Sequence, residues 1–252
     1  MAHNHAASTS QRVGTVAFDI AYQAIFDIAN DRVFAYEALL RGPDGESADS
    51  VLAEAAQARC PDFDQSVTAM AIAKAVSLGL LDTDAGLAIN VMPDGVVGAR
   101  RSSDMTLACA VAAGLPPARL IFEFNENVRF DVEYARAFVT EFRKHGFRTA
   151  LDDFGTGYSG LVVLADIATD IVKLDMALIR GIDSSDERRR IVTGVVRILL
   201  DLGRQVVAEG IETAGELAAM RSIGVDLVQG FYLGTPSRTA LQCHSDRLVH
   251  AA

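Results

Sequence analysis

The sequence predicts an α/β fold, a TIM-barrel-like (β/α)8 barrel with an extra N-terminal antiparallel strand. Short apolar strands alternate with amphipathic helices through most of the chain, which indicates a mainly parallel sheet. A polar side chain also follows nearly every strand, and a (β/α)8 barrel assembles its active site at the carboxyl ends of its strands. An open doubly wound sheet would need a glycine-rich G-x-G-x-x-G loop after the first strand, which this chain lacks.

The composition limits the kind of protein. The chain has 252 residues, half of them hydrophobic, and no Gly/Ser/Pro-rich linker divides it. We therefore expect one domain over residues 15–245, a disordered lead-in over 1–14 and a tail over 246–252. A net charge of −10 argues against binding to polymeric nucleic acid or to an anionic membrane. Three widely spaced cysteines favour reduced thiols in a cytoplasmic setting, and no apolar run reaches the roughly 18 residues of a membrane span.

The expected elements begin with two paired strands, 16–28 and 32–40, joined by the turn Ala29-Asn30-Asp31. Helices are expected at 50–58, 64–80, 96–113, 159–167, 187–202 and 214–223, and another is expected from a cap at Asp131 to a stop at Gly146. Ser184 and Glu187 match a capping box for the helix over 187–202. The remaining strands are expected at 86–91, 119–124, 149–151, 170–174, 205–208 and 226–228.

Two adjacent carboxylates, Asp152 and Asp153, follow the buried strand that ends at Leu151. Successive side chains of an ideal strand point to opposite faces, so the two aspartates should diverge. At a strand end the pleat can break, and both could then turn toward one site. The alternative is a polar turn in which an aspartate caps the next helix.

Polar residues recur at the ends of the other strands. Each has an ordinary explanation: Asn90 could cap a helix, Lys173 could be a surface lysine, and Glu209 could be an acid in a helical first turn. Together they would converge on one barrel mouth, where such a cluster is costly without a cation. Oxygen ligands favour Mg²⁺ or Mn²⁺ over zinc. The set comprises Glu37, Asn90, Glu123, Asp152, Asp153, Lys173, Glu209 and Gln229.

An ordered series of short motifs carries a family resemblance from about Ala21 to Pro236. The motifs are Tyr22-Gln23-Ala24-Ile25, Glu37-Ala38-Leu39, Ile89-Asn90-Val91, Glu123-Phe124-Asn125-Glu126, the run from Asp152 to Ser159, Val172-Lys173-Leu174-Asp175, the run from Ala208 to Thr213, and Gln229-Gly230-Phe231. In this order they resemble the EAL domain family of bacterial phosphodiesterases, which hydrolyse the second messenger cyclic di-GMP. The resemblance implies the linear product pGpG and two Mg²⁺ or Mn²⁺ ions.

The resemblance also implies roles for individual residues. Glu37, Asn90, Glu123 and Asp152 would ligate one ion, Asp153 a second, and Glu209 would lie at the water of the metal site. Lys173 would orient or activate that water, which makes Lys173, Glu209 and Glu37 the expected catalytic residues. Gln23, Arg41, Asn90, Lys173 and Gln229 would contact the substrate or support its site. Glu126 and Glu212 would anchor the mobile loop at 155–160.

The chain departs from the family pattern at Ala24, Gly42, Asn125 and Gly160, and none of these changes removes an expected ligand. The resemblance further implies a homodimer through the segment after the two aspartates. Two other functions stay open: a catalytically weak cyclic di-GMP receptor on the same fold, and an unrelated Mg²⁺-dependent barrel enzyme acting on another phosphate or an enolisable acid. The apolar residues of the proposed dimer segment are Tyr158, Leu161, Val162, Val163 and Leu164.

Overall fold

A closed barrel of eight strands forms the centre of the molecule. The computed structural model describes residues 10–60, 62–91, 99–125, 132–157 and 160–242. The barrel closes because β2 pairs with β3 on one side and with β9 on the other. The strands are β1 (Gln11–Val13), β2 (Val16–Asp27), β3 (Arg32–Arg41), β4 (Gly86–Asn90), β5 (Leu120–Asn125), β6 (Arg148–Phe154), β7 (Ile171–Leu174), β8 (Gln205–Ala208) and β9 (Leu227–Val228).

The strand directions agree with the predicted architecture. From β3 to β9 each strand runs parallel to the next, whereas β2 is antiparallel to both of its neighbours. The (β/α)8-like barrel with an antiparallel N-terminal strand is therefore confirmed. Parallel strands place their carboxyl ends at one rim of the barrel, and the antiparallel β2 brings its amino-terminal half to the same rim.

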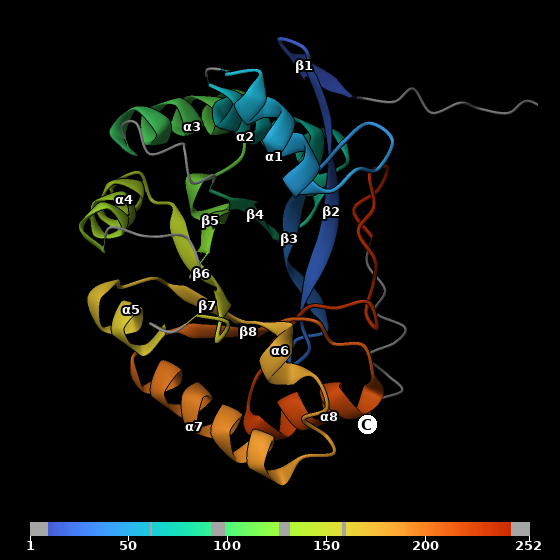
Figure 1. The fold of residues 1–252 in the computed structure, drawn as a ribbon, viewed down its shortest axis with the longest axis vertical. Helices are drawn as coiled ribbons and strands as arrows, with labels where there is room; N and C mark the ends of the chain where they lie inside the picture. Colours follow the sequence, from blue (N-terminus) through green and yellow to red (C-terminus); the bar gives the residue numbers. More distant parts are fainter. Residues whose placement is uncertain (1–9, 61, 92–98, 126–131, 158–159, 243–252) are drawn as a thin grey trace, which may run out of the picture.

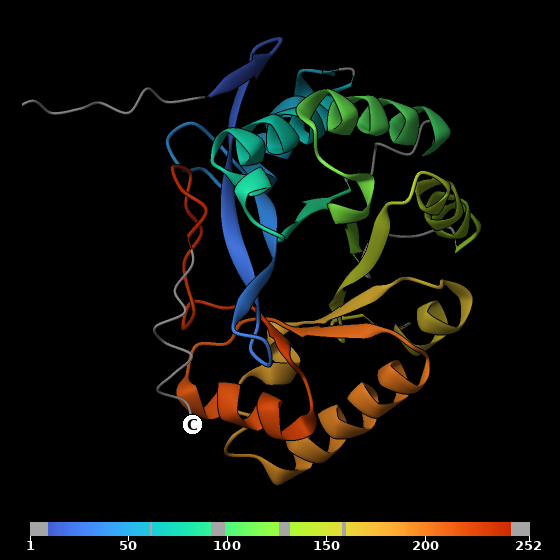
Figure 2. The same cartoon turned by 180° about the vertical axis from the view of Figure 1, so that it is seen from behind.

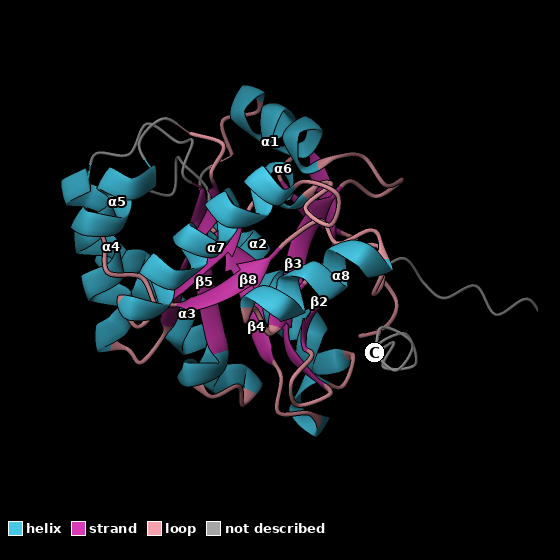
Figure 3. Ribbon diagram, turned by 90° about the horizontal axis from the view of Figure 1, so that it is seen from below, coloured by secondary structure: helices cyan, strands magenta, loops and turns pink. Residues whose placement is uncertain are grey.

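Helices surround the barrel, as Figures 1 and 2 show from opposite sides and Figure 3 shows from below. They are α1 (Ala48–Gln57), α2 (Phe63–Ser77), α3 (Ala99–Ala113), α4 (Val132–Lys144), α5 (Gly160–Asp166), α6 (Met176–Ile179), α7 (Asp186–Asp201) and α8 (Ala214–Ile223), with short 3₁₀ turns at Leu80–Asp82 and Pro117–Arg119. The expected apolar stripe of α4 is buried against the sheet. Among the helices of the described ranges, none has both the length and the apolar character needed to cross a bilayer.

Local sequence signals account for most helix ends. Thr213 and Glu216 form a capping box at the start of α8, and Gly224 ends that helix with φ of 90°. The predicted cap of α7 is wrong by one residue. The hydroxyl of Ser185 accepts from the Arg188 backbone N–H, whereas the Ser184 hydroxyl donates to the Gly181 carbonyl. The expected cap at Asp131 lies outside the described residues.

Part of the expected disordered lead-in is a strand. Residues 11–13 form β1, which pairs with Val16–Phe18 through a tight turn at Gly14, whose φ is 61°. This turn needs the left-handed conformation that glycine adopts without steric cost. Two of the three residues of β1, Gln11 and Arg12, are polar and exposed, so no apolar alternation predicts this strand.

The barrel interior contains a layer of apolar side chains, one from each barrel strand. We call this set the apolar layer; it is packed as one cluster and excludes polar side chains from the middle of the barrel. Its members are Ile25, Ala35, Ala88, Ile121, Ala150, Ile171, Val207 and Leu227.

Candidate active site

A second layer of side chains lies two residues beyond the apolar layer on every barrel strand. Because strand side chains alternate with a period of two, these residues point into the barrel on the same face as the apolar layer. On the antiparallel β2 the step runs backward along the chain, from Ile25 to Gln23. We call this set the polar layer; its members are Gln23, Glu37, Asn90, Glu123, Asp152, Lys173, Glu209 and Gln229. The structure thus places all these predicted residues at one rim.

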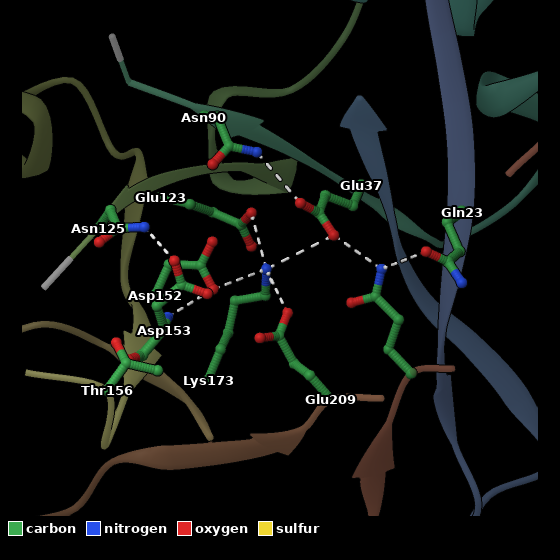
Figure 4. Close-up of polar contacts among 11 residues, drawn as sticks. Gln23, Glu37, Asn90, Glu123, Asn125, Asp152, Asp153, Thr156, Lys173 and Glu209 are labelled. Carbon is green, nitrogen blue, oxygen red and sulfur yellow. Dashed lines mark hydrogen bonds and ion pairs between the residues drawn. The ribbon is translucent and has the colours of Figure 1, made fainter. Parts of the chain in front are cut away.

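Lys173 lies at the centre of this site (Figure 4). Its Nζ is 2.8 Å from Glu209 Oε1, 3.0 Å from Glu123 Oε2 and 3.1 Å from Asp152 Oδ1. A fourth carboxylate oxygen, Glu37 Oε2, is 3.5 Å away. The Lys173 side chain is 1% exposed. Such a buried ammonium is stable because several carboxylates surround it, so the alternative of a surface lysine is wrong.

Amide side chains fix the orientation of Glu37. Asn90 Nδ2 donates to Glu37 Oε1 at 3.1 Å, and Gln229 Nε2 donates to Glu37 Oε2 at 2.7 Å. Gln229 also contacts Gln23 Oε1 at 3.3 Å, and the Gln23 amide donates to the Gly234 carbonyl at 2.9 Å. Both oxygens of Glu37 are thereby held from opposite sides, which prevents rotation of the carboxylate.

A β-bulge brings Asp152 and Asp153 to the same site. In the pairing of β6 with β7, two residues, Asp152 and Asp153, stand opposite the single Lys173. Asp153 has a left-handed φ of 55°, and its N–H donates to Asp152 Oδ1 at 3.0 Å. A bulge re-aims side chains in this way, at a cost of about 1–2 kcal/mol for a non-glycine residue in that conformation. The expectation that the pleat breaks here is confirmed, although β6 continues to Phe154.

Two groups of carboxylates are close enough to hold cations. Glu37, Glu123 and Asp152 form one group, and Asp152, Asp153 and Glu209 form the other; within each group the ligand atoms lie within 4.8 Å of one another. Asp152 belongs to both groups. All the donors are carboxylate oxygens, which suits a hard divalent ion such as Mg²⁺, Mn²⁺ or Ca²⁺.

The site shifts the protonation of its own residues. Burial raises the pKa of Glu123 and of Glu209 well above the usual range, against the opposing effect of Lys173. Burial also tends to raise the pKa of Glu37, but Lys173, Gln229 and Asn90 outweigh it, so that pKa is lowered. Burial and the neighbouring Asp152 raise the pKa of Asp153 to about 6. Added positive charge would stabilise these carboxylates in their ionised form.

Two predicted residues in the described part of the chain are not joined to this network. Arg41 Nη1 donates to the Leu40 carbonyl at 2.7 Å, and Glu212 accepts from Arg180 at 2.6 Å. The roles of Arg41 in substrate binding and of Glu212 as a loop anchor stay predictions. Glu126, the other proposed anchor, lies outside the described residues.

Sequence reasoning missed the part played by Asn125, whose amide donates to Asp153 Oδ2. Asp175 was quoted within a motif but given no role, and it lines the cavity beside Glu209. Both could have been found from strand periodicity, since Asn125 is two residues beyond Glu123 and Asp175 two beyond Lys173. The cavity has a volume of ≈ 260 Å³, and its lining also includes Met176 and Phe231.

Comparison with known proteins identifies the family. The EAL domain family model matches residues 7–236. The chain belongs to the EAL domain family. A standalone EAL protein from Vibrio cholerae O395, solved in its cyclic di-GMP-bound form, superposes with a TM-score of 0.84 at 38% identity, over 92% of this chain and 98% of that one.

Other EAL proteins are similar over parts of longer chains. Klebsiella pneumoniae BlrP1, in a manganese and cyclic di-GMP complex, has a TM-score of 0.82 at 35% identity, over 91% of this chain and 58% of that one. The Escherichia coli antirepressor BluF is 29% identical over 86% of this chain and 53% of its own length. Escherichia coli cyclic di-GMP phosphodiesterase PdeR is 32% identical over 56% of this chain and 22% of its own length. This chain thus spans about half or less of these curated relatives.

Proposed function

We propose that this EAL domain hydrolyses cyclic di-GMP to linear pGpG by in-line attack of an activated water on one phosphodiester. The observation that carries the proposal is the position of Asp152, which belongs to both carboxylate groups at the carboxyl rim of the barrel. The carboxylate common to both groups would help to hold both cations. Relatives at about 30% identity are named cyclic di-GMP phosphodiesterases, which supports the choice of substrate.

The charge of the site supports two divalent cations. Its five carboxylates and one ammonium, when ionised, leave four uncompensated negative charges, which is the charge that two divalent ions neutralise. When bound, two Mg²⁺ or Mn²⁺ ions would supply activation of the attacking water and neutralisation of the substrate phosphate. The residues proposed to hold them are Glu37, Asn90, Glu123, Asp152, Asp153 and Glu209.

Lys173, Glu209 and Glu37 are the proposed catalytic residues. The Lys173 ammonium is fixed among four carboxylates, which together take up its three N–H donors. It would donate to the attacking water where bound cations take over some of these carboxylates. Glu209 is half-buried at the mouth of the cavity, where its carboxylate can accept a proton from a water above it. Glu37 is held at both oxygens by Asn90 and Gln229 and keeps its orientation as charge develops.

The cavity above the polar layer is the proposed substrate site. Gln23 and Gln229 contribute amide groups to its wall, and Phe231, with 59% of its surface exposed, offers an apolar ring face to a base. Arg41 is proposed to reach a substrate phosphate from the end of β3. The other residues proposed to contact the substrate are Asn90 and Lys173.

The deciding experiment is incubation with cyclic di-GMP and a single divalent cation, with nucleotides separated by chromatography. We expect pGpG with Mg²⁺ or Mn²⁺. We expect no turnover with Ca²⁺, because its longer bonds and looser geometry suit an in-line displacement poorly. The control variant Asp166→Asn removes an exposed carboxylate from α5 and should keep full activity. Absence of product with every cation, at full binding of cyclic di-GMP, would refute the hydrolase proposal.

A specific comparison favours a second candidate, a cyclic di-GMP receptor with weak or no turnover. BluF, which is 29% identical, is named an antirepressor, so EAL domains occur in proteins named for regulation. Calorimetry separates the two functions, since a receptor would bind cyclic di-GMP in Mg²⁺ and leave it intact. The complete carboxylate set of the polar layer favours hydrolysis.

The homodimer and the cytoplasmic location stay predictions. Of the proposed dimer segment, Val162 is 62% exposed, whereas Val163 and Leu164 are buried against the barrel. The side chains of Tyr158 and Leu161 lie outside the described residues. A monomeric mass by light scattering across the concentration range of the assay would exclude the dimer.

A further inference from the structure

The opposite rim of the barrel contains a second polar cavity. It has a volume of ≈ 140 Å³ and lies at the amino-terminal ends of the parallel strands. Arg119 and Arg148, in its wall, each precede an apolar-layer residue by two positions, as Glu123 and Asp152 follow one by two. The apolar layer therefore separates this cavity from the candidate active site. A cavity of this size has room for about five water volumes, enough for one small tetrahedral ion.

Positive charge dominates the wall of this cavity. Three arginines, Arg32, Arg119 and Arg148, line it together with a single carboxylate, Asp84, in a chain whose net charge is −10. Arg32 is already paired with Asp27, at 3.1 Å. Within the described ranges, no carboxylate lies within 4.0 Å of the guanidinium of Arg119 or of Arg148. The local charge is thus opposite to that of the molecule as a whole.

Neutral groups hold the two unpaired guanidinium groups in place. Arg119 donates from Nε to the Ala85 carbonyl and from Nη2 to the Leu80 carbonyl, both at 2.8 Å. Arg148 donates to Gln205 Oε1, and its Cζ lies 5.2 Å from the centre of the Phe34 ring. Burial lowers the pKa of both arginines, and Asp84 and Asp170 offset this only in part. Both cations are therefore partly desolvated and fixed in direction before any ligand arrives.

We propose that this cavity is a binding site for a tetrahedral oxyanion, namely free phosphate or the phosphoryl group of a small phosphomonoester. Arg119 uses Nε and Nη2 on backbone carbonyls and keeps the two N–H groups of Nη1 for such an ion. Arg148 keeps a neighbouring pair of N–H donors that matches two oxygens of the ion. The side chains of Arg119 and Arg148 are preorganised, so little conformational entropy is lost on binding. Because Asp27 neutralises Arg32, Arg119 and Arg148 counted against Asp84 leave one net positive charge, which an anion in the cavity would offset. The site is independent of the proposed hydrolysis at the other rim.

The test is calorimetric titration of the intact chain in buffer containing a chelator, with inorganic phosphate as the first probe. We expect saturable binding of one phosphate per chain. Arg148→Gln should weaken it by about tenfold or more, because a charge-assisted pair of hydrogen bonds is lost. The matched control, Arg136→Gln, removes an exposed arginine of α4 that pairs with Asp166 and should leave the affinity unchanged. Asp152→Asn should also leave it unchanged, which would exclude binding at the carboxylate rim.

Further arms of the titration identify the ligand class. Glycerol 3-phosphate that binds as tightly as phosphate would indicate a phosphomonoester site, and much weaker binding would indicate a site for the free ion. Acetate that binds as tightly as phosphate would overturn the tetrahedral class. A heat of titration that does not saturate with phosphate, or equal phosphate affinity in wild type and Arg148→Gln, would overturn the site itself. If Arg148→Gln fails to fold, Arg148→Lys replaces it; this variant keeps the charge, loses the paired donors and should bind severalfold more weakly.

Discussion

The apolar layer and the polar layer of the barrel differ sharply in chemistry although they share the same strands and the same face. Ile121 and Glu123 are adjacent inward positions of β5, and Ala150 and Asp152 are adjacent inward positions of β6. One layer is packed by dispersion and excludes water. The other holds four carboxylates around Lys173. Two residues along a strand are enough to pass from a region that stabilises the fold to a region that can do chemistry. The two layers should therefore respond differently to mutation.

The largest expected effect on activity is that of Asp152→Asn. The change removes the carboxylate common to both groups and leaves the size of the side chain nearly unaltered, so turnover of cyclic di-GMP should fall by more than about 100-fold. A readout that does not depend on activity is thermal stabilisation by Mn²⁺. At 100 times its dissociation constant, Mn²⁺ should raise the unfolding free energy of the unaltered chain by about 2.7 kcal/mol. The variant should lose most of this gain while keeping its metal-free circular dichroism. Full turnover in Asp152→Asn would contradict the shared-ligand assignment.

Ile121→Ala should have the converse effect. Ile121 is 1% exposed within the apolar layer, so its truncation should lower the unfolding free energy by about 2–5 kcal/mol. Turnover per folded molecule should change little, because the change lies two residues from Glu123 and removes no polar contact. Urea unfolding and steady-state kinetics on the same sample give both quantities. Ile121→Val is the matched milder variant and should cost about 0.5–1.5 kcal/mol. A large loss of turnover in Ile121→Val would show that the two layers are not separable.

A smaller effect is expected at Asn125, which contacts Asp153 beside the polar layer. Asn125→Ala removes the amide that donates to Asp153 and should weaken divalent-ion affinity by about tenfold, with little loss of stability. Metal titration by calorimetry measures this directly. Asn125→Asp is a useful second variant, since it places a like charge against Asp153 and should weaken the affinity further.

Glu126→Ala, at the proposed loop anchor, should reduce metal affinity and turnover by about 10–100-fold. Unchanged metal affinity in both alanine variants would mean that the bulge alone positions Asp153.

The smallest effect is expected at the rim opposite the polar layer. Burial tends to raise the pKa of Asp27, but hydrogen bonds from Asn30 and Arg32 outweigh it, so that pKa is lowered. A lowered folded-state pKa gives stability that is present above the unfolded value of about 3.9 and is lost as pH falls through the folded value. Asp27→Asn should therefore destabilise the chain by about 1 kcal/mol at most at pH 7. The difference from the unaltered chain should shrink as the pH falls below the unfolded value and vanish once Asp27 is protonated in the folded chain, in acid titrations of urea unfolding. A difference that persists there would show that the contribution of Asp27 is not electrostatic.

Much of the architecture could be predicted because its signals are local. Apolar periodicity gave α4, and the expected helix at 214–223 matches α8, although its cap by Thr213 and Glu216 was not predicted. The strand β1 could not be predicted in this way, because it is held by backbone pairing with β2 and not by burial of an apolar face. The start of α7 was misplaced because Ser184 and Ser185 both resemble caps, and only the turn at Gly181 decides which hydroxyl is free to serve.

The site itself was predictable to a different extent. Strand ends and family motifs placed the polar layer, because a parallel barrel brings such residues to one rim whatever the details of packing. The central position of Lys173 depends on distances to four strands and is not encoded in any one segment. The contact from Asn125 to Asp153 likewise depends on the left-handed φ of Asp153, a conformation that no neighbouring residue type enforces.

Because the two layers are two residues apart on each strand, a change in strand length should be far more damaging than a substitution. A substitution changes one layer at one strand and leaves the other intact. Deletion of a single residue within β5, for example Phe122, would turn either Glu123 or Ile121 outward toward the helices, because a one-residue slip exchanges the two faces of a strand. Such a deletion would remove from the barrel interior either the apolar residue or the carboxylate that β5 contributes. Length changes should therefore be confined to the loops of the barrel, whereas the chemistry of its rim can be altered one position at a time.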